Sequence, residues 1–233
     1  NYMTKFESNP LHSHDDDLSF VIYTKIPKQL KIEYNKCKAN TKPGAINFII
    51  SLDEGWINQH TFVPEVGDFF IFPADLKHYV NHFKSNGERI SISGNLKDNF
   101  FTKKEYEILY NNLDKIYFLP NVNKTGNYAA SHPFEPDEQN KWLFDKIKKQ
   151  FFPNEDLEIV ICRFDVRHNK GKVFSHLDNK NTNYNCLIYL KGEEVTYNGT
   201  GFYYENNLNT YIGFVKNRAL FFDGANIVHS DLQ

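Results

Sequence analysis

Residues 67–79 read GDFFIFPADLKHY, and residues 218–229 read RALFFDGANIVH. Each stretch holds a short aromatic and aliphatic run, then a turn-forming segment, then a histidine, which is His78 in the first stretch and His229 in the second. Short apolar runs bounded by turn residues predict β-strands. The two stretches therefore predict a β-fold in which each histidine closely follows a strand.

Each of these histidines has a pair of potential metal ligands far upstream in the chain. The pairs lie in HSHDDD (residues 12–17) and in FSHLD (residues 174–178). The two ligands of a pair are two residues apart, so on an extended strand they point to the same face. A third ligand from a distant strand closes one face of an octahedral ion and leaves three positions open, as in the two-histidine, one-carboxylate site of non-haem Fe(II). The predicted sets are His12, His14 and His78, and His176, Asp178 and His229.

The composition indicates a globular protein with a small ligand. The chain has 233 residues, which suffice for one large or two small domains, and 40% of them are hydrophobic. A net charge of -2 gives no reason to expect a nucleic acid or an anionic membrane as partner, so a small-molecule or peptide substrate is favoured. Neither the composition nor the net charge indicates the oligomeric state.

Cysteine usage and hydropathy predict a cytoplasmic protein. The three cysteines form no CxxC pair and are odd in number, which suits a reducing compartment; they are Cys37, Cys162 and Cys186. No apolar run approaches the roughly 20 residues that a bilayer span needs, and no signal-peptide profile is visible.

The order of the expected elements indicates two tandem units. Four strands are expected before residue 95, at 18–24, 45–51, 68–72 and 89–93. An amphipathic helix follows the capping pair Thr102 and Glu105, and a second helix is expected over about 137–151. Further strands are expected at 157–166, 184–190, 201–204, 211–215 and 219–222. The expected fold is mainly β with flanking helices (α+β), a double-stranded β-helix of the jelly-roll or cupin type. The expected units are residues 1–97, lacking an N-terminal part, and residues 98–233, with a helical preface and lacking the C-terminal strand.

Several motifs resemble one enzyme superfamily. CRFDVRHNKGKVFSH (residues 162–176), GTGFYY (199–204) and FFDG (221–224) resemble the 2-oxoglutarate and Fe(II)-dependent oxygenases of the prolyl-hydroxylase-like group. NPLHSHDDDLSFVIY (9–23) and ERISISGN (88–95) are similar to a second branch, common in marine bacteria and their phages. Together the two resemblances cover nearly the whole chain.

The resemblance implies roles for single residues. It makes His176, Asp178 and His229 a complete set of iron ligands, with 2-oxoglutarate as cosubstrate. The arginine that clasps the far carboxylate of 2-oxoglutarate is expected about ten residues after the last histidine, and Arg89 follows His78 by eleven. No residue of the chain occupies that place after His229. In the second unit, three residues on expected strands are candidates to hydrogen-bond 2-oxoglutarate, namely Asn185, Tyr189 and Tyr203.

The first unit departs from the family pattern, because His14 stands where the acid is expected. Three interpretations stay open: a three-histidine site, a triad that borrows Asp15 or Asp16, or a unit that no longer binds iron. His78 is preferred over His82 as the third ligand because it directly follows the strand. An ordinary charge on the strand surface is the alternative for Arg89.

The resemblance implies a hydroxylase that uses Fe(II), 2-oxoglutarate and dioxygen. Two alternatives remain: a non-catalytic jelly-roll module that binds sugar or protein, and a metal-dependent cupin that does not use 2-oxoglutarate. The substrate is not readable from the motifs, because specificity in such folds resides in the loops around the barrel mouth.

Overall fold

The computed structural model describes residues 1–39, 42–53, 56–119, 128–151, 158–167, 175–182, 184–194, 198–204 and 207–232. These residues form fifteen strands, three α-helices and one short 3-10 helix, which confirms the expected mainly-β class with helices. None of the described helices is both long enough and apolar enough to cross a membrane.

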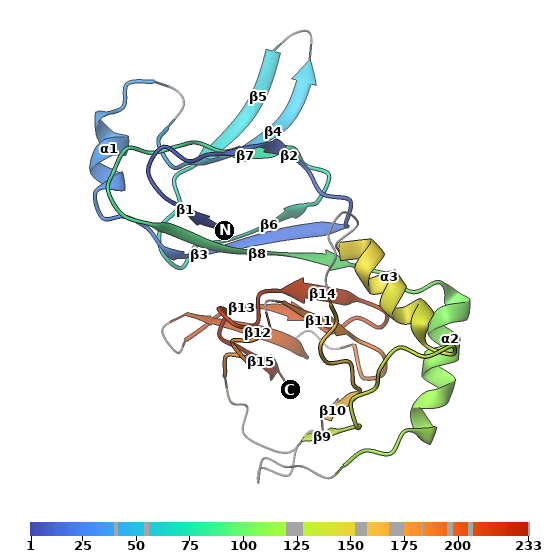
Figure 1. The fold of residues 1–233 in the computed structure, drawn as a ribbon. Helices are drawn as coiled ribbons and strands as arrows, with labels where there is room; N and C mark the ends of the chain where they lie inside the picture. The colour runs from blue at the N-terminus through green and yellow to red at the C-terminus, as the bar shows by residue number, and fades with distance from the viewer. Residues whose placement is uncertain are drawn as a thin grey trace. The chain divides into compact units, whose positions relative to one another are not determined.

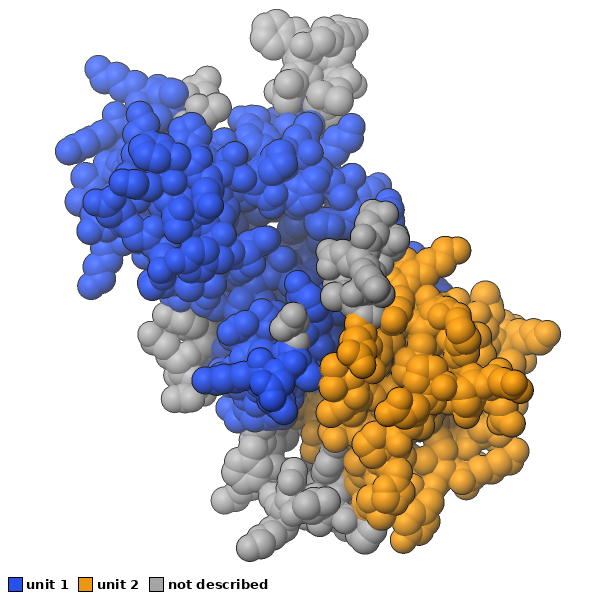
Figure 2. All heavy atoms as spheres, viewed as in Figure 1, with its two compact units in different colours: residues 1–100, 175–230 blue, residues 101–174, 231–233 orange. Residues whose placement is uncertain are grey.

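The chain divides into two compact units (Figure 2). Unit 1 comprises Asn1–Phe100 and Ser175–Ser230, and unit 2 comprises Phe101–Phe174 and Asp231–Gln233. These units do not coincide with the expected segments 1–97 and 98–233, because strands from both segments lie in one sheet of unit 1. The division into two related copies stays a prediction.

The central sheet of unit 1 has six strands in the order β11-β14-β8-β3-β6, and β1 pairs with β8 beside this path. Its pairs are antiparallel, with Phe20 opposite Gly94 between β3 and β8, and Leu220 opposite Leu96 between β14 and β8. The strands are β1 (Tyr2–Met3), β3 (Leu18–Lys25), β6 (Phe69–Pro73), β8 (Arg89–Lys97), β11 (Asn185–Ile188) and β14 (Ala219–Phe222).

Two smaller sheets form from the described residues of unit 1, and the last two residues of β15 in one of them belong to unit 2. One has the order β2-β7-β4-β5, and the other has the order β13-β12-β15. Figure 1 shows β2, β7, β4 and β5 as a layer that faces β3, β6 and β8. The bounds are β2 (Asn9–His12), β4 (Ile46–Asp53), β5 (Trp56–Phe62), β7 (His78–Val80), β12 (Gly199–Tyr204), β13 (Asn207–Gly213) and β15 (His229–Leu232), with one helix, α1 (Leu30–Lys36).

Strand β3 explains how the central sheet is buried. Side chains alternate between the two faces of a strand. Val21 and Tyr23 lie in one apolar cluster with Phe48, whereas Phe20 and Ile22 lie in a second one. Residues of the second cluster from β12 and β14 are Phe202, Leu220 and Phe222. Both faces of β3 are therefore covered, which is why its sequence is a continuous apolar run rather than an alternating one.

Unit 2 contains the helices α2 (Lys103–Asn112) and α3 (Lys141–Phe151), the 3-10 helix η1 (Leu113–Lys115), and the antiparallel pair β9 (Tyr128–Ala130) and β10 (Asp165–Arg167). The expected capping box is present, because Thr102 and Glu105 bond each other's backbone N–H. The expectation of a strand over 157–166 is wrong for residues 158–164. Among the described residues of this range, Asp165 and Val166 lie in a strand, which is β10. Val160 and Ile161 are exposed, so their apolar character does not reflect a sheet position. The start of that segment, Leu157, lies outside the described residues.

Candidate metal centres

The first predicted ligand set comes together in unit 1. His12 ends β2 and lies opposite His78, which begins β7. His14 lies two residues beyond β2, where its backbone N–H donates to the Ala74 carbonyl at 2.8 Å. One nitrogen from each of the three rings lies within 4.8 Å of the others. Among the described residues, this group consists of histidines alone and includes neither Asp15 nor Asp16.

Backbone contacts orient two of these rings. Nδ1 of His12 is 2.7 Å from the Pro10 carbonyl, and Nδ1 of His78 is 2.9 Å from the Leu76 carbonyl. A carbonyl only accepts, so each Nδ1 carries a proton, and in the neutral form of each ring Nε2 has a lone pair that can bind a metal. Burial, reinforced by His12 and His78, lowers the pKa of His14 to about 4, and burial also lowers the pKa of His78. These two rings are therefore neutral at neutral pH, which is the form that binds metals.

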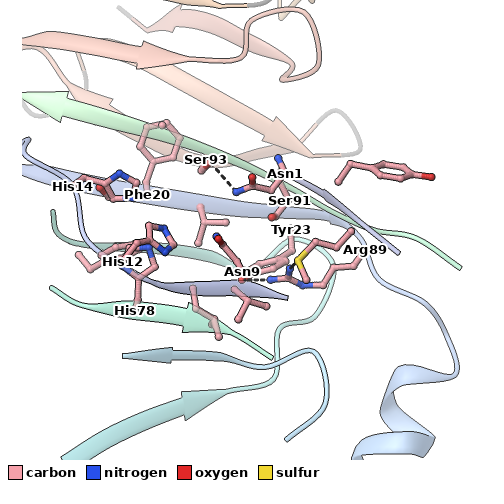
Figure 3. A pocket seen from close by; sticks show the side chains of 18 of the residues that line it. Asn1, Asn9, His12, His14, Phe20, Tyr23, His78, Arg89, Ser91 and Ser93 are labelled. Carbon is pink, nitrogen blue, oxygen red and sulfur yellow. Dashed lines mark hydrogen bonds between the residues drawn. The ribbon is translucent and has the colours of Figure 1, made fainter. Parts of the chain in front are cut away.

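A cavity of about 370 Å³ opens beside the three histidines. Figure 3 shows their rings at one end of it and the guanidinium of Arg89 with Tyr23 at the other, with Asn9 between them. Arg89 is only 1% exposed, so it is not an ordinary surface charge. His82, the less favoured third ligand, is exposed and not part of the histidine group.

Arg89 is buried and forms no ion pair with an acidic side chain among the described residues. Its Nη2 donates to the Tyr23 hydroxyl at 2.8 Å, and its Nη1 donates to Sδ of Met3 at 2.9 Å. Its Nε is the buried side-chain polar atom that lacks a hydrogen-bond partner within the described ranges. Burying a charge is costly unless a counter-charge compensates it. Because Arg89 lines the cavity, the cavity suits an anionic ligand.

Tyr23 supports the same interpretation. Burial raises the pKa of the Tyr23 phenol, although the neighbouring Arg89 opposes the shift. The phenol therefore keeps its proton at neutral pH. Its oxygen accepts from Arg89, and its O–H can donate to a ligand in the cavity.

The second predicted ligand set also comes together in unit 1. His176 and His229 face each other across a β-bridge and exchange two backbone hydrogen bonds of 2.9 Å. Nε2 of His229 is 3.2 Å from Oδ2 of Asp178, and Nε2 of His176 is 3.6 Å from Oδ1. Two ligands at right angles on an ion, each at roughly 2.1 Å, would be about 3 Å apart. Small side-chain adjustments would bring all three atoms onto one ion.

The surroundings of Asp178 keep its carboxylate ionised and in place. Burial alone would raise its pKa, but the hydrogen bond and charge of His229, the charge of His176 and the amide of Asn185 hold it below the ordinary value. Asn185 on β11 donates to Oδ2. Gly224 leaves room for this pair, since a Cβ there would lie 2.4 Å from Oδ2 of Asp178 and 2.6 Å from Nδ2 of Asn185.

The two ligand sets share a local construction. In each, the first and last histidines face each other across antiparallel backbone, as His12 does with His78 and His176 with His229. In each, the preceding strand also supplies a phenylalanine edge-on to the last histidine. The ring centroids are 4.8 Å apart for Phe72 and His78, and 4.9 Å apart for Phe222 and His229.

The other residues that were predicted to bind 2-oxoglutarate near the second ligand set divide into two groups. Asn185 contacts the ligand set directly. Tyr189 shares a 2.7 Å hydrogen bond with the Thr200 hydroxyl, and the Tyr203 hydroxyl accepts from Ser230 at 2.9 Å. Both hydroxyls therefore take part in hydrogen bonds within the protein, and a role of either tyrosine in binding 2-oxoglutarate stays a prediction.

Sequence reasoning missed three residues at these sites, which are Met3, Tyr23 and Gly224. Tyr23 belongs to an expected strand, but a strand buried on both faces gives no sign of which side chains face a cavity. The pattern FFDGA does contain a signal for Gly224, because a glycine between a strand and a ligand often marks a close approach of backbone or side chains.

Comparison with known proteins supports the oxygenase superfamily for the N-terminal part of the chain. Residues 1–95 match the model of a family described as putative 2OG-Fe(II) oxygenase. The match contains His12, His14, His78 and Arg89, and it ends before the second ligand set. No curated protein matches the chain.

Proposed function

We propose that this protein is an Fe(II)- and 2-oxoglutarate-dependent dioxygenase that hydroxylates a small-molecule or peptide substrate. The reaction takes place in the cavity between the three histidines and Arg89. One observation carries the proposal: a buried arginine, which pairs with no acidic side chain of the described residues, shares a cavity with three convergent imidazoles.

The residues of the cavity have distinct roles in this proposal. His12, His14 and His78 hold the metal and leave the rest of its coordination sphere open. Arg89 and the Tyr23 hydroxyl bind the far carboxylate of 2-oxoglutarate, since a guanidinium fork matches a carboxylate well. The bound Fe(II) and 2-oxoglutarate supply the activation of dioxygen that hydroxylation requires.

The donor set is also consistent with an anionic cosubstrate. Three neutral imidazoles leave the full double charge of Fe(II) uncompensated in a half-buried site. A dianion that chelates the metal with one end and reaches Arg89 with the other would compensate most of their combined positive charge. His14 in the place of a carboxylate therefore does not argue against 2-oxoglutarate on electrostatic grounds.

We further propose that the second ligand set binds a metal and that the two sets belong to two copies of one double-stranded β-helix unit. The shared backbone pairing and the matching phenylalanine contacts support this. The two copies share one sheet, since β8 of the first copy pairs with β14 of the second copy.

One alternative has an observation in its favour. The all-histidine set of the first site lacks the carboxylate of the usual Fe(II) triad, which favours a metal-dependent cupin that does not use 2-oxoglutarate. Such a protein binds metal but gains no thermal stability from N-oxalylglycine, an unreactive analogue of 2-oxoglutarate. A true cosubstrate site is stabilised by its ligand through mass action.

The first test compares two arginines. Arg89→Gln should weaken the binding of N-oxalylglycine to the Mn(II)-loaded protein by at least about tenfold, because one charge-assisted hydrogen bond contributes roughly 1.5–3 kcal/mol. Isothermal titration calorimetry measures this. The matched control is Arg218→Gln, which removes a bidentate pair with Asp98 and should lower stability while leaving the affinity unchanged. Equal affinities of Arg89→Gln and the parent would refute the clamp.

The second test decides which ligand set performs the chemistry. His14→Ala and Asp178→Ala should each lower the bound Mn(II) from two ions per chain to one, because a set that loses one of three ligands holds metal poorly. Metal analysis of the purified variants measures this. Release of succinate from 2-oxoglutarate should be lost in His14→Ala and retained in Asp178→Ala. The reverse pattern would place the reaction at the second set, and release retained in both variants would contradict chemistry that depends on one set. A parent protein that releases no succinate would indicate a non-catalytic module.

A further inference from the structure

Met3 is the sole methionine of the chain, and it lies directly against the arginine of the cavity. Strand β1 pairs with β8 so that Met3 is opposite Arg89. Nη1 of Arg89 donates to Sδ at 2.9 Å. Met3 is 6% exposed and lines the cavity, so its sulfur is next to the space that a ligand would fill.

The hydrogen-bond strength of this sulfur depends on its oxidation state. A thioether is a weak acceptor, so it leaves the guanidinium of Arg89 available to a stronger one. Oxidation converts the flexible apolar side chain into a polar sulfoxide with a strong acceptor oxygen. Because the strand register holds Met3 and Arg89 opposite each other, that oxygen would form beside the donors of Arg89.

We propose that Met3 is an oxidative modification site whose sulfoxide closes the carboxylate end of the cavity. The oxidant is hydrogen peroxide, which is small enough to enter the cavity. One peroxide oxygen bonds to Sδ as the O–O bond breaks, the thioether loses two electrons, and the remaining oxygen leaves as water. The sulfoxide oxygen then accepts hydrogen bonds from Arg89 and competes with the ligand carboxylate for them.

This inference rests on the proposed function, since it assumes that Arg89 binds a carboxylate. It goes beyond that function because it makes cosubstrate binding depend on peroxide. The position of Met3 makes the effect specific: among the described residues, Sδ of Met3 is the sulfur that accepts a hydrogen bond from Arg89.

The experiment uses the full chain with metal removed by chelation, so that peroxide generates no metal-derived radicals. After peroxide treatment, dithiothreitol reverses cysteine sulfenic acids and disulfides, and peptide mass analysis of residues 1–5 (NYMTK) quantifies the Met3 sulfoxide. The protein is then loaded with Mn(II) and titrated with N-oxalylglycine. Oxidation of Met3 should weaken binding by at least about tenfold, the effect of losing one charge-assisted hydrogen bond.

Two variants separate Met3 from other oxidation targets. Met3→Leu keeps the side-chain volume and removes the sulfur, so peroxide treatment should leave its affinity at its own untreated value. Met3→Gln carries an amide oxygen as a stand-in for the sulfoxide, so its affinity should be at least about tenfold below that of Met3→Leu without any oxidant.

The outcomes are distinguishable. The inference is overturned if fully oxidised Met3 leaves the affinity unchanged, if Met3→Leu loses affinity as the parent does, or if the affinities of Met3→Gln and Met3→Leu are equal. It is also overturned if Met3 stays reduced under conditions that oxidise the free peptide NYMTK. If the untreated parent binds no N-oxalylglycine, the proposed function fails and the inference fails with it.

Discussion

Gly224 has no side chain, and this allows the second ligand set to assemble. The carboxylate of Asp178 and the amide of Asn185 meet in the space that a Cβ at this position would occupy. The contact orients a ligand through a neighbour that does not itself bind the metal. Changing such a supporting contact typically weakens metal binding by about 10–100-fold.

Gly224→Ala should therefore weaken metal binding at the second set by about 10–100-fold, the usual effect of disturbing a group that orients a ligand. The added methyl group would lie 2.4 Å from Oδ2 of Asp178 and displace it. Competition with a chromophoric chelator measures the affinity. Asn226 is exposed and lies in the same turn, so Asn226→Ala serves as the control and should retain the metal affinity of the parent. Unchanged affinity in Gly224→Ala would show that Asp178 is not a ligand.

At the scale of residues, the sequence predicted which ligand sets would lie together but not how their surroundings are built. The i and i+2 spacing and the histidine after an aromatic strand are local patterns. In the structure, the three residues of each set lie close to one another. Met3 and Tyr23 were not predicted, because their contact with Arg89 arises from pairing across 86 and 66 residues of sequence. Metal binding itself stays a prediction.

At the scale of elements, β8 connects the cavity to the rest of unit 1. Arg89 at its start lines the cavity, and Lys97 at its end pairs with Ala219 of β14. Between them, Gly94 lies opposite Phe20. A Cβ at Gly94 would lie 2.3 Å from the Phe221 carbonyl oxygen and 2.4 Å from Cζ of Phe20, so neighbouring backbone and an aromatic ring both fill this space.

Gly94→Ala should lower the free energy of unfolding by roughly 1–3 kcal/mol, the usual cost of adding a methyl group to a well-packed core. The methyl group forces either β14 or the Phe20 ring to move. Urea denaturation followed by circular dichroism measures the change. Ser93→Ala, at the exposed neighbouring position, should change stability by no more than about 0.5 kcal/mol. Equal stabilities of the two variants would contradict the close approach of β8 and β14.

The long apolar strands were predictable, and the short polar ones were not. The expected strand at 219–222 coincides with β14, and the one at 18–24 differs from β3 by a single residue. By contrast, β2 spans four residues and contains Asn9, Pro10 and His12, and β7 spans three residues and begins with His78. Such strands depend on their pairing partners rather than on their own composition, because β-propensity reflects the packing of neighbours.

At the scale of the whole molecule, the second apolar cluster joins the two segments that the sequence suggested as separate units. Phe20, Ile22, Ile92 and Leu96 come from the first segment. They pack against residues of the second segment, among them Phe202, Leu220 and Phe222. Exposing four such side chains would cost roughly 6–12 kcal/mol, which is comparable to the entire stability of a typical domain.

A fragment of residues 1–97 should therefore fail to fold as a monomer, even though it contains the first ligand set and Arg89. Size-exclusion chromatography and thermal denaturation should show aggregation or no cooperative transition, whereas the full chain unfolds cooperatively. Co-expression with residues 98–233 should restore soluble protein. A monomeric fragment with a cooperative transition would contradict the joint core and favour two independent units.

The sequence by itself determined the mainly-β class and predicted the two ligand sets, and the family resemblance added Arg89 as a candidate beside the first set. These features are encoded locally, by residue spacing, by apolar runs and by short distances along the chain. Only the tertiary structure decided that Arg89 is buried in the cavity, that Met3 and Tyr23 bond to it, and that β8 and β14 share one sheet. The physical reason is that burial and cross-strand contacts depend on which distant strands pair and in which register, and a one-residue shift in register would turn every side chain to the opposite face.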